Sequence, residues 1–495
     1  MPSADQHSSS PGLRVHTRFA EPMVWMCSGA LVTAIALLVA LLVLLSVRGL
    51  GQFWPQPLIL ATDATDQQRV HLGRVLHRQS REAQFLVYRG GEGLFASTLA
   101  WVPEADWAQT RAPDTALVIE RENEGPVFGF LVEVREEGVW EDVDAASVDE
   151  QIEALTRLAL PLPAPSADPS PSANAPTRDS DTTPAYRLRL STGEVVELPG
   201  AGVRYAYAPN AQELGDKVRF FFAAIDRFLS ESPQDSNTQG GVFPAIVGTV
   251  TLVLLMTVLV TPLGVLAAVY LQEYAQRGPV TQLVRIAVNN LAGVPSIVYG
   301  VFGLGFFVYT LGGSIDSLFF AKQLPAPTLG TPGMLWSALT MALLTLPVVV
   351  VTTEEGLARV PAALREGSFA LGATRAETLL QVILPAASPA LLTGLILAIA
   401  RATGEVAPLL LVGVAKYAPG LPVDSQFPFL HLDRQFMHLG FYIYDLGFQS
   451  PDLVTREGLV FATALLLVLI VLALNTAAVL LRGRLREAFR PDETL

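Results

Sequence analysis

The chain has few charged residues and almost no cysteine. Of its 495 residues 16% are charged and 51% are hydrophobic, whereas soluble domains carry roughly 25% charged residues. The one cysteine, Cys27, excludes a disulfide framework and a cysteine-ligated metal site. The six histidines lack the spacing of a zinc site, and a net charge of −13 argues against nucleic acid as a partner. The shortage of charged residues indicates that lipid solvates much of the chain.

Apolar runs long enough to cross a membrane are plentiful, since a spanning helix needs roughly 20 mostly apolar residues. The first run, Met23–Val47, is long and no small-residue cleavage site follows it, so we expect an uncleaved anchor rather than a signal peptide. Proline and glycine interrupt two later runs, which is tolerated where a helical bundle surrounds the break. The five later runs are Phe243–Leu271, Ile286–Leu311, Met334–Thr352, Ala387–Val414 and Gly458–Leu481.

Basic residues set the expected orientation, because Lys and Arg are enriched in cytoplasmic loops. With the N-terminus inside, the inner segments carry Arg14, Arg18, Arg277, Arg285, Arg359, Arg365, Arg375, Arg482, Arg484, Arg486 and Arg490. The short outer segments carry fewer, namely Arg48, Lys322, Lys416, Arg434 and Arg456. We therefore expect both termini in the cytoplasm.

This topology divides the chain into five parts. Residues 1–22 are a cytoplasmic N-terminus, 23–47 the first span, 48–240 a periplasmic insert, 241–482 a core of five further spans, and 483–495 a cytoplasmic tail. Residues 51–240 hold 29 acidic and 16 basic residues, a difference of −13. The acidic balance of the whole chain therefore lies in the insert.

The insert has the pattern of an α+β domain. Stretches rich in Val, Leu, Phe and Tyr predict strands at Glu82–Tyr88, Leu94–Val102, Ala116–Arg121 and Val127–Arg135. Thr192-Gly193 predicts the turn of a hairpin between Tyr186–Leu190 and Glu194–Leu198. We expect a helix at Asp149–Leu160 and a flexible linker at 161–184. Ala211–Leu229 has helical spacing and either lies along the membrane surface or packs on the sheet.

The segment 353–385 between the fourth and fifth spans predicts two amphipathic helices joined at Gly372, where a turn favours a residue without a Cβ atom. Glu366, Gly372 and Leu384-Pro385 have a distinctive spacing. It resembles the cytoplasmic coupling loop of binding-protein-dependent ABC permeases, in which Glu-Ala-Ala is followed after three residues by Gly and after nine more by Ile-x-Leu-Pro. In that family the loop inserts into a separate ATPase, which implies a coupling role for Glu366, Gly372, Ala373, Leu384 and Pro385. An ordinary interfacial helix would not explain these spacings.

Three further stretches resemble the permease subunits of phosphate ABC transporters. They are NNLAGVPSIVYGVFGL at Asn289–Leu304, LILAIARATGEVAPLLL at Leu395–Leu411 and FYIYDLGF at Phe441–Phe448. The GE-x-APLL ending favours the PstA type over the PstC type. The resemblance covers about residues 240–485. It implies an all-α polytopic membrane protein with six transmembrane helices and a MetI-like ABC permease core, to which the extracytoplasmic α+β insert is added.

The resemblance also implies a function and partners. The chain would be a permease subunit, not an enzyme, of an ATP-driven importer that moves inorganic phosphate inward by alternating access. It would pair with a PstC-like permease, a cytoplasmic PstB-like ATPase dimer and a periplasmic PstS-like phosphate-binding protein in the bacterial inner membrane. ATP and Mg²⁺ would bind the ATPase, and no cofactor is expected in this chain. Because the insert is acidic, we expect it to bind protein rather than phosphate.

Two other functions stay open at this point. The same type of permease could carry another oxyanion such as molybdate, tungstate or sulfate. A membrane sensor with an extracytoplasmic domain is less favoured, since the inner segments are too short for an output domain.

Two charged residues, Arg401 and Glu405, fall inside the fifth apolar run. A charge at the membrane centre costs up to roughly 3 kcal/mol on insertion scales, so it should face a cavity or a partner. A guanidinium matches the oxygens of phosphate, which makes Arg401 the first candidate for a substrate contact. At a spacing of i and i+4, Glu405 shares its helical face. Glu405 either holds Arg401 extended or weakens phosphate binding enough for release; otherwise the two form a structural ion pair.

Polar residues also cluster around Pro295 in the third run. Pro295 removes one backbone hydrogen bond from a helix. Asn290, Ser296 and Tyr299 lie within a turn or two of it. They either line the substrate pathway or satisfy the kink.

Overall fold

The computed structural model describes residues 17–62, 70–79, 83–91, 94, 97–103, 110–122, 125–136, 138–158, 184–200, 202–234, 239–276, 278–323, 325–418, 420–449 and 453–488. Most of the expected N-terminal segment, nearly all of the expected linker at 161–184 and the end of the expected tail lie outside these residues.

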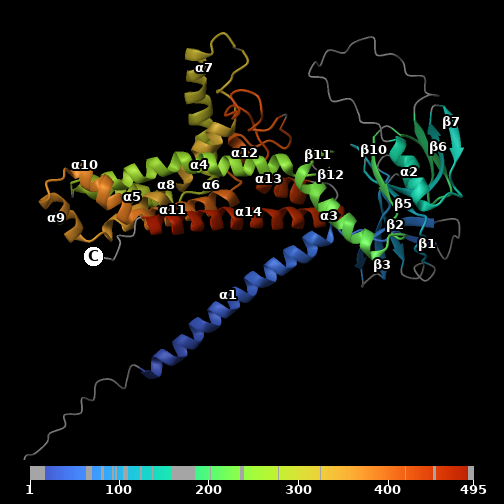
Figure 1. Cartoon of the computed structure of the whole chain (residues 1–495), viewed down its shortest axis with the longest axis horizontal. Helices are drawn as coiled ribbons and strands as arrows, with labels where there is room; N and C mark the ends of the chain where they lie inside the picture. The colour runs from blue at the N-terminus through green and yellow to red at the C-terminus, as the bar shows by residue number, and fades with distance from the viewer. Residues whose placement is uncertain are drawn as a thin grey trace, which may run out of the picture.

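Six helices in the described part are long and apolar enough to cross a membrane. They agree with the predicted fold of a polytopic membrane protein. Figure 1 shows α4, α8, α11 and α14 side by side in one bundle, with the insert at one end and α9 and α10 at the other. The six spans are Val24–Gly51, Phe243–Tyr274, Ser296–Phe319, Met334–Ala358, Arg375–Gly404 and Val454–Arg484.

The centre of the bundle is held by the close approach of α4 (Phe243–Val269), α8 (Met334–Ala358) and α11 (Leu384–Gly404). A Cβ atom on Gly264 would lie 2.6 Å from Cγ1 of Val349, and one on Gly356 would lie 2.5 Å from Cβ of Ala390. Small residues allow such contact between membrane helices. The helix α14 (Leu453–Ala488) completes this side of the bundle.

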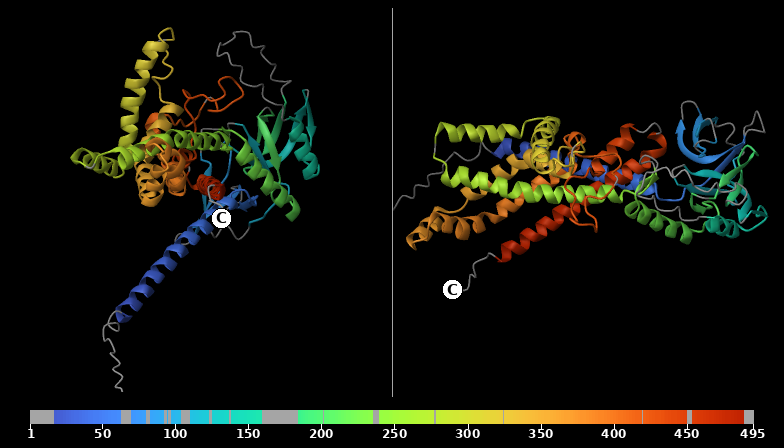
Figure 2. Two further views of the ribbon diagram at one scale, coloured as in Figure 1. Left: turned by 60° about the vertical axis from the view of Figure 1, so that its left-hand side comes forward. Right: turned by 90° about the horizontal axis from the view of Figure 1, so that it is seen from above.

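The first helix, α1 (Thr17–Gly51), diverges from the others (Figure 2, left). Only its end approaches the bundle, where a Cβ atom on Gly49 would lie 2.9 Å from Cα of Ala462 in α14. Apolar side chains along the rest of α1 are exposed, including Trp25 at 78%. This helix therefore presents its apolar surface to lipid or to another subunit.

The third and fifth apolar runs are not single helices, so the predicted spans at Ile286–Leu311 and Ala387–Val414 were wrong in this respect. The third is divided at residues 292–295 into α5 (Pro279–Leu291) and α6 (Ser296–Phe302). The π-helical segment η4 (Gly303–Gly312) and α7 (Gly313–Phe319) continue α6, and α7 projects from the side of the bundle (Figure 1). The fifth is divided after Gly404, where α11 ends, and α12 (Leu409–Val412) follows.

Two larger antiparallel sheets make up most of the described part of the insert. The first has the order β1 (Ile59–Thr62), β2 (Val70–Gln79), β3 (Gln84–Tyr88) and β4 (Leu99–Pro103). The second has the order β10 (Val203–Tyr207), β5 (Leu117–Arg121), β6 (Val127–Glu136), β8 (Ala185–Arg189) and β9 (Val195–Pro199), while β7 (Val139–Asp142) also pairs with β6.

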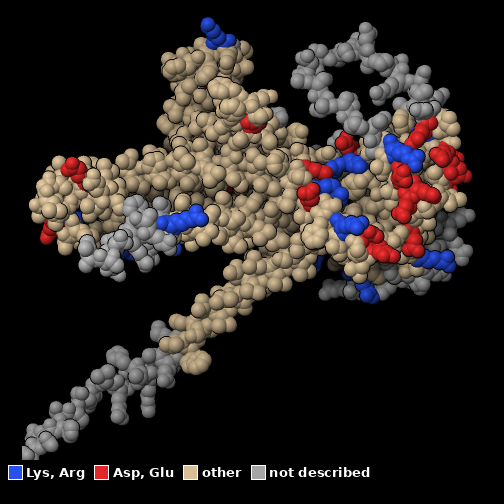
Figure 3. All heavy atoms as spheres, viewed as in Figure 1, with Lys and Arg blue, Asp and Glu red and all other residues tan. Residues whose placement is uncertain are grey.

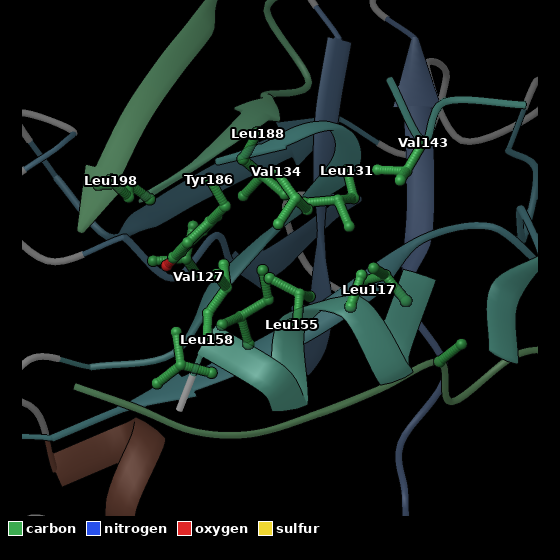
Figure 4. Packing of buried hydrophobic residues seen from close by; sticks show 14 of the residues in the cluster. Leu117, Val127, Leu131, Val134, Val143, Leu155, Leu158, Tyr186, Leu188 and Leu198 are labelled. Atoms are coloured by element: carbon green, nitrogen blue, oxygen red, sulfur yellow. The ribbon is translucent and has the colours of Figure 1, made fainter. Parts of the chain in front are cut away.

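The helix α2 (Val148–Leu158) covers the second sheet and completes the core of the insert. Leu155 and Leu158 of α2 point toward Leu131, Val134 and Tyr186 of the sheet (Figure 4), and all five side chains are almost fully buried.

The predicted strands correspond to β3, β4, β5 and β6, and the predicted hairpin is confirmed as β8–β9, with Leu188 opposite Val196. The predicted helix at Asp149–Leu160 corresponds to α2. The strands β1, β2, β7 and β10 were not predicted.

The helix α3 (Leu214–Ser230) joins the insert to the bundle. Its Phe220 packs on Tyr207 of the sheet, with 4.4 Å between ring centroids, and its Phe228 packs on Phe53 at the end of α1, with 5.1 Å. Of the two predicted arrangements, packing on the sheet is therefore present. Short strands β11 (Pro233–Gln234) and β12 (Gln239–Gly240) connect α3 to α4.

Charged side chains gather on the insert, whereas the bundle face in the same view shows very few (Figure 3). This distribution is the one expected of a membrane domain that carries a water-exposed domain at one end.

Candidate functional site

The break in the fifth span exposes backbone and side-chain polar groups in the middle of an apolar sequence. The helix α11 ends at Gly404, residues 405–408 are not helical, and α12 resumes at Leu409. Non-helical backbone at membrane depth is tolerated only where protein or a water-filled cavity surrounds it. In transporters, discontinuous helices of this kind often form substrate sites.

Arg401 and Glu405 lie at this break. Arg401 is in the last turn of α11, and its Nη2 is 3.6 Å from Oε1 of Glu405. Glu405 follows the helix with extended backbone (φ −88°, ψ 120°). The sequence predicted that the two residues share one helical face. In the structure they pair across the end of α11 instead. A cation in this position is also stabilised by the negative end of the helix dipole.

The guanidinium of Arg401 has donor capacity to spare. Its Nε is buried and has no hydrogen-bond partner in the described part of the chain. Its side chain is 38% exposed and that of Glu405 is 25% exposed. An ion pair at 3.6 Å with an unused buried N–H is incompletely satisfied, so the arrangement can accept an additional anionic ligand.

Tyr299 of α6 lies beside this pair. A Cβ atom on Gly300 would lie 2.8 Å from Cα of Pro408, so α6 is in direct contact with the break. The hydroxyl of Tyr299 donates to the carbonyl of Leu291 across the break between α5 and α6, at 2.6 Å. The ring of Tyr299 belongs to the same buried cluster as Ala402 and Leu409, which lie on either side of the break in the fifth span. The two broken spans thus meet at Gly300 and Pro408, next to Tyr299 on one span and a few residues after Arg401 and Glu405 on the other.

The other predicted pathway residues lie apart from this pair. Asn290 is exposed near the end of α5, where its carbonyl accepts from the N–H of Gly293 at 3.0 Å. Ser296 is half-buried at the first position of α6. No interaction in the described part of the chain joins either side chain to Arg401. The structure therefore brings together Arg401, Glu405 and Tyr299 of the five predicted residues.

A cavity between α5 and α8 was not predicted. Its volume is about 260 Å³, and Asn289, Ala292, Pro347 and Val351 are among its lining residues. Pro347 within α8 is the feature of the sequence that could have indicated it, because a proline inside a helix leaves a carbonyl without its partner.

The predicted coupling segment forms two helices and a sharp turn, as expected. The helix α9 (Ala362–Ala370) carries Glu366 on its exposed surface, and α10 (Arg375–Thr378) leads through the π-helical segment η5 (Leu379–Ile383) into α11. Gly372 has φ +89°, which confirms the need for glycine. The N–H of Gly372 donates to Phe369 at 3.0 Å, and that of Ala373 donates to Ser368 at 3.2 Å.

The second helix of this segment begins with a capping box that sequence reasoning missed. Thr374 accepts from the backbone N–H of Glu377, and the Glu377 carboxylate accepts from the N–H of Thr374 at 2.7 Å. The sequence T-R-A-E was the available signal.

An ion pair fixes the segment to the bundle and was also missed. Arg365 donates to the carbonyl of Leu357 at 2.7 Å and pairs with Glu273 at 3.0 Å. Glu273 belongs to η3 (Tyr270–Tyr274), the π-helical end of the second span. This contact joins residues 92 positions apart, so no local pattern indicates it.

The coupling segment also exposes large apolar side chains. Leu371 is 91% exposed and Leu380 is 64% exposed, and Leu364 and Phe369 are nearly half exposed. Several large apolar side chains exposed on one segment are typical of an interaction surface.

The profile of the family described as "Binding-protein-dependent transport system inner membrane component" matches residues 260–487. The phosphate transport system permease protein PstA 1 of Mycobacterium tuberculosis is 35% identical over 244 residues, which are 49% of this chain and 71% of that protein. The PstA proteins of Yersinia pestis and Haemophilus influenzae are 34% and 32% identical over 51% of this chain, and the matches cover 75% and 79% of those proteins.

Among solved structures, the inward-facing MetNI methionine ABC transporter matches with 19% identity and a TM-score of 0.34, over 51% of this chain and 95% of that one. The sequence matches alone determine the family. The insert precedes the region that the family profile matches.

Proposed function

Because the chain belongs to the family of binding-protein-dependent transport system inner membrane components and resembles its PstA members, we propose that it is a permease subunit of an ATP-driven importer of inorganic phosphate. In this proposal it pairs with a second, PstC-like permease in the bacterial inner membrane. A PstB-like ATPase dimer binds ATP and Mg²⁺, and a PstS-like binding protein delivers phosphate.

The observation that carries the proposal is the state of Arg401 at the broken fifth span. Orthophosphate is an anion near neutral pH, and a guanidinium offers it planar donors that remain charged. The buried Nε of Arg401 has no partner in the described residues, and Glu405 is at 3.6 Å. Phosphate would occupy the free donors, and Glu405 would compete for the same guanidinium. Such competition keeps binding weak enough for release.

The coupling segment supports the transport mechanism. In alternating access the ATPase biases one conformation of the permease over the other. The exposed apolar side chains of α9 and the following turn would contact the ATPase, and the Arg365–Glu273 pair would transmit the movement to the second span. A rigid pair of helices can transmit a displacement that a flexible loop would absorb.

The proposed orientation in the membrane follows from where the insert and the coupling segment lie. The insert and the α9–α10 segment lie at opposite ends of the bundle (Figure 1). If α9 and α10 contact a cytoplasmic ATPase, the insert is periplasmic. Both termini are then cytoplasmic, as the distribution of basic residues predicts.

The test is ATP-dependent uptake of labelled phosphate into vesicles that hold the full complex, at matched protein levels. Arg401→Gln is expected to abolish uptake while the complex and its ATPase activity stay intact. Glu405→Gln is the matched variant: it breaks the same ion pair but keeps the guanidinium, so uptake should persist with altered phosphate affinity. Normal uptake by Arg401→Gln would contradict the proposal. Equal losses in the two variants would assign the pair a structural role.

Competition by molybdate, tungstate or sulfate in the same assay tests the transported anion. Phosphate uptake that these anions leave unchanged at equal concentration supports the proposed substrate. Strong inhibition by one of them would identify that oxyanion instead.

A further inference from the structure

A second group of arginines surrounds a cavity where the insert meets the bundle. The cavity has a volume of about 180 Å³. Its walls come from β2, β5, β10 and α3, and from the adjoining ends of α1 and α14. Arg74, Arg204 and Arg227 line it together with Glu120 and Glu231. None of these residues belongs to the proposed phosphate pathway.

The guanidinium of Arg227 in α3 is positioned by aromatic rings, but one of its hydrogen-bond donors is unused. Its guanidinium lies 4.2 Å from the ring centroid of Tyr205 and 5.4 Å from that of Phe220. These aromatic contacts fix the plane of the guanidinium. Its Nη2 is buried and lacks a hydrogen-bond partner in the described part of the chain. Arg227 therefore presents an oriented, unused donor.

Arg74 of β2 is in a similar state. Its Nη2 donates to the hydroxyl of Tyr207 at 2.6 Å, and its guanidinium lies 5.2 Å from the ring centroid of Phe128. Its Nε is buried and is likewise unpartnered among the described residues. Two arginines on different elements thus have buried N–H donors that make no hydrogen bond among the described residues. Such donors are costly to leave without a partner.

The cavity is positively charged although the insert as a whole is acidic. Arg204, only 17% exposed, forms an ion pair with Glu231. The three arginines and two glutamates leave one excess positive charge when both carboxyls are ionised. Burial also raises the pKa of Glu120, against the opposing effect of the three arginines. Loss of that carboxylate charge would increase the excess.

We propose that this cavity binds a phosphate group, carried either by inorganic phosphate or by the headgroup of an anionic phospholipid. Guanidinium donors on separate elements suit the tetrahedral oxygens of phosphate. Phe53 and Leu459, at the ends of two membrane spans, form an apolar part of the wall. A lipid could place its glycerol backbone there, whereas inorganic phosphate would need only the arginines. This local site is an exception to the expectation that the acidic insert binds protein alone.

The test uses the purified full chain in detergent, in an Arg401→Gln background, so that binding at the proposed transport site does not contribute. One arm measures equilibrium binding of labelled inorganic phosphate. The other measures retention of phosphatidylglycerol by native mass spectrometry, with diacylglycerol as the ligand that lacks phosphate. Binding in the first arm assigns the site to free phosphate, and binding in the second assigns it to lipid.

Arg227→Gln is expected to weaken binding at least tenfold. Arg219→Gln is the matched control, because Arg219 lies on the same helix, carries the same charge and is 90% exposed. Arg74→Gln, on a different element, should reproduce the loss. Arg227→Lys, which keeps the charge, should retain part of the affinity and shows that the fold is intact.

Two results would overturn the inference. One is the absence of binding of both ligands to the parent chain. The other is equal binding by Arg227→Gln, Arg74→Gln and Arg219→Gln. Because the background already lacks Arg401, failure here is separate from failure of the proposed transport function.

Discussion

Gly372 allows a direct test of how the coupling segment works. Its φ of +89° lies in the region that favours glycine. A Cβ atom added there would meet no other atom within 4 Å. Substitution by alanine therefore introduces backbone strain without a steric clash, and the effect of the turn can be measured by itself.

The expected cost follows from the backbone geometry. A left-handed conformation costs a residue with a Cβ atom about 1–2 kcal/mol. In the free protein Gly372→Ala can relax, because the segment is exposed. If the segment docks on the ATPase as proposed, the original turn must be restored, so the cost would appear in the affinity for the ATPase. At 1.4 kcal/mol per factor of ten, affinity should fall about 5- to 30-fold.

The assay is binding of the purified ATPase to the full permease in nanodiscs, measured by surface plasmon resonance. Phosphate uptake by the same variants should fall with the affinity. Thermal unfolding of the permease should stay nearly unchanged, since the turn lies outside its core.

Gly367→Ala is the matched control. Gly367 lies within α9, also has open space around its Cα atom and does not have a positive φ. Alanine inside a helix is favoured over glycine by about 0.5–1 kcal/mol, so this variant should bind the ATPase as well as the parent or slightly better. If the two variants lose affinity equally, the turn geometry is not what the ATPase requires, and the reasoning fails.

Three further predictions concern charged contacts. Glu273→Gln breaks the 3.0 Å pair with Arg365, a loss of about 1.5–3 kcal/mol, and should lower the phosphate transported per ATP hydrolysed in vesicles. Burial raises the pKa of the Glu120 carboxyl, so the folded insert binds the proton of this carboxyl more tightly than the unfolded chain does. The insert therefore loses stability as the pH rises through the raised pKa. Glu120→Gln should flatten the pH dependence of thermal unfolding. Hydrogen bonding, chiefly with His431, lowers the pKa of the Asp424 carboxyl to about 2. The ionised carboxylate therefore stabilises the fold above its ordinary pKa of about 3.9, and this stabilisation is lost as the pH falls toward 2. Asp424→Asn should destabilise the protein at pH 6 but much less near pH 2.

The coupling segment was predictable because its determinants are local. Gly372 and Pro385 each constrain the backbone at their own positions, and the apolar stripes report helices within a few residues. The contact between Arg365 and Glu273 is different, since it depends on how α9 packs against the end of the second span. Sequence spacing carries no record of that packing.

The two broken spans were less predictable for a related reason. Hydropathy measures how apolar a segment is, and residues 405–408 and 292–295 lie inside runs that are apolar on average. Pro295 was recognised as an interruption, but its effect was assigned to a kink. In the structure it precedes a new helix, and a Cβ atom on Gly300 would lie only 2.8 Å from Cα of Pro408. The close approach of these two breaks is a tertiary feature, and it places Tyr299 next to the break that follows Arg401.

In the insert, the strands that were predicted are rich in buried β-branched and aromatic residues, as in β5 and β6. The strand β2 (VHLGRVLHRQ) was missed because His, Arg and Gln interrupt its apolar pattern. The structure explains why an arginine stands at one of these positions, because Arg74 lines the cavity beside α3. The residue that weakens the strand pattern is the one that contributes to the candidate anion site.

The junction of α3 and α4 connects the insert to the membrane helices. The N–H of Val242 donates to the carbonyl of Phe228 at 2.8 Å, and that of Phe243 donates to Glu231 at 3.1 Å. Phe228 is buried among bundle residues, while Phe220, two turns earlier, packs against the sheet. A helix held at both ends in this way would transmit a rotation of α4 to the insert. Because Arg227 is adjacent to Phe228 on the same helix, a phosphate group bound there would stabilise one position of α3 relative to β2 and β10. The cavity lined by these arginines lies between the insert and the membrane helices, so a ligand bound there would restrain the angle between them.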